Sequence, residues 1–212
     1  MLTFYFSPGA CSMCPHIALE EAGAKFEAKP LSLMKGQHKA PEFLKVNPNG
    51  QVPTLVVDGK PLTENLAILL WIADQYPQAK LLPTDPWERI QAISYLARLT
   101  SDVHKGFGPL FRPQALVADE KAREDFVKNV RGLCADRMAG IDARLAGKDY
   151  ALGQFSAVDC YLYVFFAWAG YLGFDTAKWP NYAKHFERMN ARPAVQRLQA
   201  REKEAQTLLN AA

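Results

Sequence analysis

The sequence predicts an α/β first third followed by an all-helical remainder. Short strand-like runs alternate with helical patterns as far as residue 75, and no convincing strand appears beyond residue 86. Between these parts, residues 76–86 contain three prolines and little periodicity, which is typical of a linker. We therefore expect two domains, residues 1–80 and residues 87–212.

In the first domain the expected order is strand–helix–strand–helix–strand–strand–helix. The expected elements are strands at 2–6, 26–33, 51–57 and 60–63, with helices at 11–23, 41–44 and 66–75. Asp58-Gly59 is a strong hairpin signal, so the last two strands should pair antiparallel. The first helix should begin at Ser12 as its N-cap, with Pro15 in the first turn and Gly23 at its end.

The second domain shows helical periodicity throughout. Its expected helices cover 87–106, 121–145, an apolar stretch after residue 156, 179–189 and 193–208. Ser156 and Asp159 have the spacing of a capping box at the start of the apolar stretch. Because that stretch is apolar on nearly every face, we expect it to be the central, enclosed helix.

The composition excludes several classes of protein. Of 212 residues, 49% are hydrophobic, which is ample for a core, and the net charge of +3 is spread along the chain without a basic block. Nucleic acid and anionic membranes are therefore unexpected partners. No signal peptide is visible, and the longest apolar run, 158–174, is too short to span a bilayer. We expect a soluble, cytoplasmic protein.

The pair Cys11-x-x-Cys14 lies where a strand gives way to a helix. Free backbone N–H groups at a helix start favour a thiolate over a thiol, and this spacing in this context indicates thioredoxin-like redox chemistry. Cys11 is the expected accessible thiol, whereas Cys14 is as easily read as a core residue. Cys134 and Cys160 lie inside helical patterns as apolar fillers. The cysteines and histidines form no metal-ligand pattern, so no metal is expected.

Two further pairs gain meaning beside Cys11. In the thioredoxin architecture a cis-proline faces the active-site turn, and Val52-Pro53 before a strand suits that position. The backbone of Val52 would then be free to pair with a cysteinyl peptide. Glu64-Asn65 opens a helix, where Glu64 could receive an ammonium group while Asn65 and the helix N–H groups receive a carboxylate. This combination suggests a site for an amino-acid zwitterion, although a first-turn acid that only stabilises the helix dipole is common.

The four histidines differ in their surroundings. His104-Lys105 follows small residues one and two turns earlier, Ala97, Thr100 and Ser101, which suits the wall of a cleft. His16 and His185 are expected to be ordinary structural or surface residues, and His38, in a polar loop, is undecided.

The whole chain resembles a bacterial glutathione S-transferase, closest to the beta class. The motifs behind this are Ser7-Pro8-Gly9-Ala10-Cys11-Ser12 with Pro15-His16, Asn47-Pro48-x-Gly50-Gln51-Val52-Pro53, Leu62-Thr63-Glu64, His104-Lys105-Gly106-Phe107 with Pro109-Leu110-Phe111, and Ser156-x-x-Asp159. The resemblance implies a thioredoxin-like βαβαββα domain that binds glutathione, an all-helical domain that forms the electrophile pocket, and a homodimer.

The resemblance also implies roles for particular residues. Cys11 matches the beta-class cysteine beside the glutathione sulfur, with Ser12 next to it, and His104 with Lys105 matches the contact from the second domain. The remaining expected glutathione contacts are Val52 with Pro53 through the backbone, Glu64 with Asn65 at the γ-glutamyl end, and Lys35 with the weaker candidate His38 in the loop at the glycyl end. Asn65 replaces a common serine or glycine, Ala97 replaces a polar contact of some relatives, and Cys14 is unusual beside Cys11.

Three functions are therefore weighed. The first is a cytoplasmic detoxification enzyme that conjugates the glutathione thiolate, as cosubstrate, to small hydrophobic electrophiles. The second is glutathione-dependent thiol–disulfide exchange, with Cys11 as nucleophile and Cys14 as a possible resolving thiol. The third is a non-enzymatic binding or regulatory protein on the same scaffold, against which the presence of Cys11, Glu64 and His104 argues.

Overall fold

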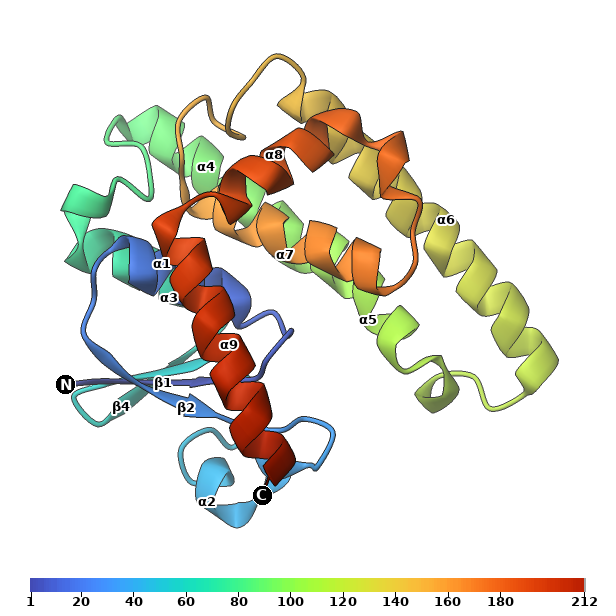
Figure 1. The fold of residues 1–212 in the computed structure, drawn as a ribbon, viewed down its shortest axis with the longest axis horizontal. Helices are drawn as coiled ribbons and strands as arrows, with labels where there is room; N and C mark the ends of the chain where they lie inside the picture. The colour runs from blue at the N-terminus through green and yellow to red at the C-terminus, as the bar shows by residue number, and fades with distance from the viewer. Residues whose placement is uncertain (212) are drawn as a thin grey trace. The chain divides into compact units, whose positions relative to one another are not determined.

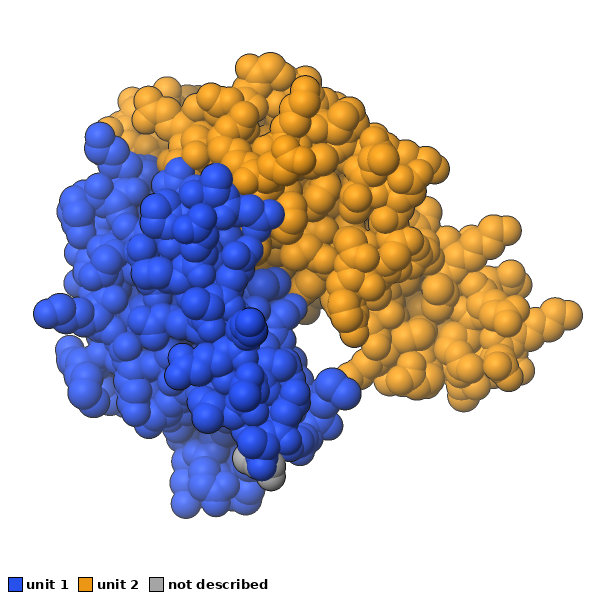
Figure 2. Space-filling view, viewed as in Figure 1, with its two compact units in different colours: residues 1–82, 190–212 blue, residues 83–189 orange. Residues whose placement is uncertain are grey.

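The computed structural model describes residues 1–211, which fall into two compact units. Of these, unit 1 contains residues 1–82 and 190–211, and unit 2 contains residues 83–189, as Figure 2 shows in blue and orange. The C-terminal helix, which the sequence assigns to the helical domain, thus packs with the first unit. No helix within residues 1–211 combines the length and apolar character needed to cross a membrane.

Unit 1 is built on a four-stranded mixed sheet (Figure 1). Its elements are β1 (Leu2–Phe6), α1 (Met13–Glu21), β2 (Phe26–Pro30), α2 (Pro41–Leu44), β3 (Thr54–Val57), β4 (Lys60–Thr63), α3 (Asn65–Gln75) and the C-terminal α9 (Pro193–Ala211). The strand order is β2-β1-β3-β4, with β1 parallel to β2 and the other two pairs antiparallel. The element order and the hairpin predicted from Asp58-Gly59 are both confirmed.

The two faces of the sheet bury different side chains. Phe4 and Phe6 of β1 alternate with Thr3 and Tyr5, as the two-residue period of a strand requires. Phe4 and Phe6 are both essentially fully buried, and their rings lie within 5.3 and 5.0 Å of the His16 ring of α1. On the other face Tyr5 contacts Phe43 of α2. The core of unit 1 therefore lies between the sheet and the helices α1 and α3.

Unit 2 is entirely helical among the residues described. It contains α4 (Pro86–Arg98), a π-helical segment (Leu99–His104), α5 (Lys105–Phe111), α6 (Glu120–Leu145), α7 (Ala157–Tyr171) and α8 (Pro180–Asn190). The sequence predicts one helix over 87–106, and the structure instead interrupts it with the π segment. Such wide turns are rare and occur frequently at functional sites.

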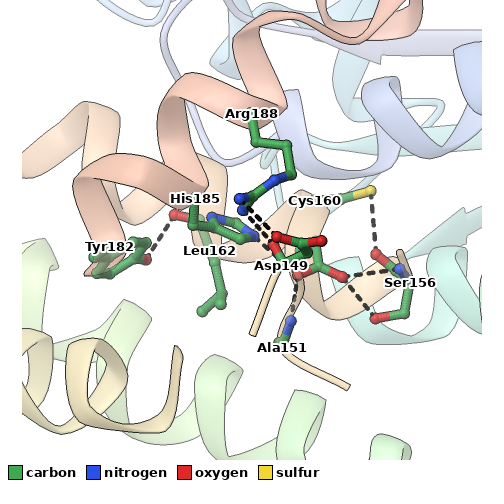
Figure 3. A network of polar contacts seen from close by, with 9 residues as sticks. Asp149, Ala151, Ser156, Cys160, Leu162, Tyr182, His185 and Arg188 are labelled. Carbon is green, nitrogen blue, oxygen red and sulfur yellow. Dashed lines mark hydrogen bonds and ion pairs between the residues drawn. The ribbon is translucent and has the colours of Figure 1, made fainter. Parts of the chain in front are cut away.

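The start of α7 is fixed by a buried polar network, part of which Figure 3 shows. Asp159 accepts hydrogen bonds from the N–H groups of Ala151 and Ser156, both at 2.8 Å, and from the Ser156 hydroxyl at 3.0 Å. His185 of α8 lies 2.9 Å from the same carboxylate, with both side chains fully buried. The predicted capping box is confirmed, and His185 is a structural residue of the core rather than a surface one.

His16 is the most unusual buried polar residue of unit 1. It is fully buried among the rings of Phe4, Phe6 and Phe26, and neither ring nitrogen has a hydrogen-bond partner within the part of the chain that the structure describes. Burial, with a smaller effect from Arg201, lowers the pKa of His16 from 6.5 to about 3. The ring is therefore packed as a neutral aromatic group.

The burial of His16 predicts a specific loss of stability in acid. Because the unfolded chain binds a proton near pH 6.5 and the folded chain does not until about pH 3, stability falls as the pH decreases between these values. At pH 5 this one site should lower the free energy of unfolding by about 2 kcal/mol relative to high pH. Urea unfolding of wild type and His16→Leu at pH 7 and pH 5 measures the effect, and the variant should lose about that much less. Equal losses in both proteins would contradict this account.

Candidate active site

The loop between β1 and α1 carries Cys11 and is closed by Ser12. The Ser12 hydroxyl donates to the Ser7 carbonyl and accepts from the Ser7 N–H, both at 3.1 Å, and the residue is fully buried. Ser12 occupies the N-cap position of α1, as predicted, but its side chain makes no capping hydrogen bond to the helix. Because its hydroxyl proton is bonded to the Ser7 carbonyl, the group of Ser12 that interacts with the Cys11 sulfur is its backbone N–H.

Cys11 faces the segment before β3. Its thiol donates to the Val52 carbonyl at 3.5 Å, and the residue itself is half-buried. The Val52-Pro53 peptide bond is cis, as predicted. The structure thus brings together the thiol and the backbone that the sequence placed in one site.

A second loop holds Val52 in place from behind. The Asn47 side chain, 2% exposed, donates to the Gln51 carbonyl at 2.9 Å and to the Thr54 hydroxyl at 3.0 Å. Its own oxygen accepts from the Asn49 N–H at 3.1 Å. Because Gln51 and Thr54 flank the cis peptide bond, Asn47 fixes the direction in which the Val52 backbone points.

Glu64 and Asn65 lie at the start of α3. Glu64 has φ 69° and ψ 124°, a positive-φ conformation that is uncommon for a residue with a side chain and costs on the order of 1–3 kcal/mol. Such conformations concentrate at functional sites. Asn65 is 5% exposed, and the hydrogen bond from its side chain to Cys11 lowers the pKa of the Cys11 thiol. The negative charge of Glu64 raises that pKa. Both residues therefore act on the same sulfur.

The thiol of Cys11 is protonated at neutral pH. Burial raises its pKa from 9.0 to about 11, and this outweighs the lowering by Asn65 and by the backbone N–H groups of Cys11 and Ser12. The expectation that the helix start yields a Cys11 thiolate is thus wrong for the free protein, because desolvation exceeds the favourable N–H interactions. Cys11 is consequently a hydrogen-bond donor.

Cys11 is also the only cysteine with appreciable exposure among residues 1–211. Cys14, Cys134 and Cys160 are fully buried. The reading of Cys134 and Cys160 as core residues is confirmed, and Cys14 takes the core alternative of its two readings. Because Cys14 is buried, it is poorly placed to attack a mixed disulfide between Cys11 and glutathione.

Lys35 and His38 lie in the loop that follows β2. The Lys35 amine donates to the Leu209 carbonyl near the end of α9 at 2.7 Å. His38 is half-buried in a short 3-10 turn covering Gln37–Lys39. This loop is therefore bonded to the C-terminal helix, a contact that the sequence analysis does not predict.

His104 and Lys105 belong to unit 2, at the junction of the π segment and α5. The Nδ1 atom of His104 lies 2.6 Å from the Tyr161 hydroxyl, and the ring lies 5.2 Å from that of Trp168. Burial, assisted by the charge of Lys105, lowers the pKa of His104 to about 4, so the ring is neutral near pH 7. Since Tyr161 takes one ring nitrogen, a ligand would contact the other, Nε2.

Two residues near these groups have no signal in the sequence. Tyr161 looks like one more apolar residue of a buried helix, yet it orients His104. Glu202 lies in a polar helix 193 positions beyond Gly9, yet it accepts the Gly9 N–H at 3.0 Å. No group of three or more His, Cys, Asp or Glu side chains that could hold a metal ion occurs in residues 1–211.

A thioredoxin-like unit with a cysteine facing a cis-proline, joined to an all-helical unit, defines a class of thiol-handling proteins. Residues 1–74 match the sequence description of the glutathione S-transferase N-terminal domain, and residues 103–193 match that of its C-terminal domain. The chain belongs to the glutathione S-transferase family, which confirms the predicted fold class and family.

Individual relatives agree over almost the full length of the chain. It is 33% identical to glutathione S-transferase GstA of Escherichia coli O157:H7, covering 92% of this chain and 96% of that protein. A Sulfitobacter glutathione transferase homologue with bound glutathione superposes with a TM-score of 0.88 at 31% identity, covering 95% and 98% of the two chains. The beta-class enzyme of Sphingomonas chungbukensis gives 0.84 at 40% identity, over 94% and 98%.

The pKa of Cys11 predicts how fast its thiol is alkylated. A pKa of about 11 rather than 9.0 leaves about 100-fold less thiolate near pH 8, so alkylation by iodoacetamide should be slow and should rise steeply above pH 9. Removing the charge in Glu64→Gln should speed the reaction by roughly threefold, and removing the hydrogen bond in Asn65→Ala should slow it by a similar factor. Rates followed by mass spectrometry test this, and changes in the same direction for both variants would refute the assignment.

Proposed function

We propose that the protein transfers the glutathione thiolate to small hydrophobic electrophiles, with Cys11 donating a hydrogen bond to that thiolate. The observation that carries this is the protonated Cys11 thiol, 3.5 Å from the Val52 carbonyl and next to the N–H groups at the start of α1. A thiol donor and helix N–H groups favour a bound thiolate, because they stabilise the charged form of the ligand sulfur.

Glutathione would change the partner of Cys11. The cysteinyl N–H of the tripeptide would pair with the Val52 carbonyl, which the Cys11 thiol occupies in the free protein. The displaced S–H group can then donate to the ligand sulfur. Each pK unit by which the site lowers the pKa of the glutathione thiol corresponds to 1.36 kcal/mol, and about two units would largely ionise it at neutral pH.

The two ends of the tripeptide would be held by different parts of unit 1. Glu64 would receive the γ-glutamyl ammonium, while the Asn65 side chain and the N–H groups at the start of α3 receive the carboxylate. Lys35, with His38 in the same loop, would bind the glycyl carboxylate. The Lys35 amine would first leave the Leu209 carbonyl, which is a neutral and therefore weaker acceptor than a carboxylate.

Unit 2 would supply the electrophile pocket and a second contact to glutathione. His104, neutral and oriented by Tyr161, would donate or accept through Nε2, and the exposed Lys105 adds a positive charge beside it. The ring of Phe111 lies 5.1 Å from Trp168 and 6.4 Å from the exposed Tyr171. Aromatic side chains of this kind suit apolar, planar electrophiles.

Thiol–disulfide exchange is less well supported. A nucleophilic cysteine reacts as its thiolate, whose fraction is very small at a pKa of about 11, and Cys14 is fully buried.

We place the protein in the cytoplasm, as a homodimer that uses glutathione as cosubstrate.

The dimer should be visible in solution. Trp87 and Ile90 lie one turn apart on α4 and are 69% and 50% exposed in the single chain, which is unusual for such side chains and supports a covered face. Sedimentation equilibrium should give twice the mass of 23.7 kDa. Trp87→Ser should weaken the association by at least tenfold, and a wild-type protein that is monomeric at micromolar concentration would refute this part of the proposal.

Substitution of Cys11 separates the two chemistries. Cys11→Ala removes one donor but leaves the helix N–H groups, so conjugation of chlorodinitrobenzene should persist with kcat/KM lowered by roughly tenfold. Cys11→Ser retains a donor and should recover part of that loss. Reduction of hydroxyethyl disulfide, if it occurs at all, should vanish in both variants.

Calorimetry with glutathione provides the control for these kinetics. Both variants should bind glutathione within a few-fold of wild type, because Val52, Glu64 and Asn65 are unchanged. Conjugation lost completely in Cys11→Ser, with binding intact, would show that the sulfur is an obligatory nucleophile and would favour exchange chemistry. Absence of glutathione binding to wild type at millimolar concentration would refute the proposed function.

A further inference from the structure

We propose that Glu202 is a positioning residue, whose carboxylate on α9 holds the loop that carries Cys11 in place. Its effect on catalysis rests on the function proposed above, whereas its effect on the Cys11 thiol does not.

The contact joins the ends of the chain. The Gly9 N–H donates to Oε2 of Glu202 at 3.0 Å, and Gly9 precedes Cys11 by two residues. Gly9 has φ 72°, a conformation that glycine adopts without strain and that sets the direction of its neighbouring peptide groups. The Ala10 N–H donates to the Ser7 carbonyl at 3.1 Å, so Gly9 lies within a tight turn. A bond to Gly9 therefore restrains the whole turn.

The helix that provides Glu202 is itself anchored to the helix that Cys11 precedes. Arg197 and Arg201 of α9 lie 2.6 and 2.8 Å from the carboxylate oxygens of Glu20 in α1, and that carboxylate is 7% exposed. Within the same unit α9 packs against α1, and Figure 1 shows it passing in front of α1. Glu202 thus acts from a support that is fixed relative to α1, rather than from a mobile tail.

The carboxylate occupies a poorly solvated position. Its Oε1 atom is buried without a hydrogen-bond partner among residues 1–211, and burial raises the pKa of Glu202 to about 7. The Gly9 N–H is the group that opposes this rise. A carboxylate is destabilised in such surroundings unless it makes a specific contact, and the contact that it makes here is with the Cys11 loop.

The expected consequence concerns the thiol. With Gly9 restrained, the Cys11 sulfur is kept against the Val52 carbonyl and partly away from water. Without the restraint the turn would sample more open conformations, which hydrate the sulfur, lower the Cys11 pKa and disturb the cradle for the ligand sulfur. Glutathione should then bind less tightly, because part of its binding energy would be used to order the turn.

The experiment compares four variants. Glu202→Ala removes the acceptor, Glu202→Asp keeps the charge but withdraws it by one methylene, and Glu202→Gln keeps a carbonyl acceptor at the same reach. Glu204→Ala is the matched control, since Glu204 is an exposed acid on the same helix. Alkylation of Cys11 by iodoacetamide at pH 8 is measured by mass spectrometry, together with KM for glutathione, kcat, and the thermal unfolding midpoint.

In Glu202→Ala and Glu202→Asp, Cys11 should be alkylated at least fivefold faster than in wild type. The KM for glutathione should rise by a similar factor, with a smaller change in kcat. Glu202→Gln and Glu204→Ala should stay within twofold of wild type. If Glu202→Ala does not fold, Glu202→Asp carries the test.

Wild-type alkylation and KM in folded Glu202→Ala or Glu202→Asp would overturn the proposal, as would equal effects in Glu204→Ala. Failure of Glu202→Gln to restore wild-type behaviour would overturn the role of the hydrogen bond. Faster alkylation in Glu202→Ala, in a protein that neither binds nor conjugates glutathione, would support the positioning role and refute the proposed function alone.

Discussion

The hydrogen bond from the Cys11 thiol to the Val52 carbonyl is the contact on which the site depends. It joins the loop before α1 to the loop before β3, across the antiparallel pair of β1 and β3. Each side is rigid for its own reason: Ser12 closes one loop through Ser7, and Asn47 braces the other. A weak bond between two rigid loops can be exchanged for a ligand without rearranging either of them. This is a form of preorganisation.

Much of this could be predicted from the sequence. Glycine and proline predicted the hairpin at Asp58-Gly59 and the cis bond at Val52-Pro53, because the hairpin turn and the cis bond each require a backbone geometry that few residues adopt. The apolar run after Ser156 is the buried helix that its composition predicts. The element order of unit 1 also follows, since its strands are short and bounded by turn residues.

The remainder depends on three-dimensional surroundings that sequence patterns do not carry. The protonation of Cys11 is decided by burial, which a helix-start argument does not measure. The hydroxyl of Ser12 bonds to Ser7 rather than to the helix that it precedes. Tyr161 and Glu202 contact residues 57 and 193 positions away, so no local spacing connects them with His104 or Gly9. His185 has a polar helix around it in sequence but a buried carboxylate beside it in space.

The grouping of α9 with unit 1 has a consequence for how the molecule is made. Residues 83–189 are, in terms of packing, an insertion between the two pieces of unit 1. During synthesis the sheet and its first helices emerge before residues 83–189, and the helix that pairs with Glu20 emerges after them. Domains commonly fold from the N-terminus as they emerge, but unit 1 is complete only after α9 has been synthesised. Residues 83–189 can fold in the meantime, and unit 1, which carries Cys11, is completed only when α9 has formed.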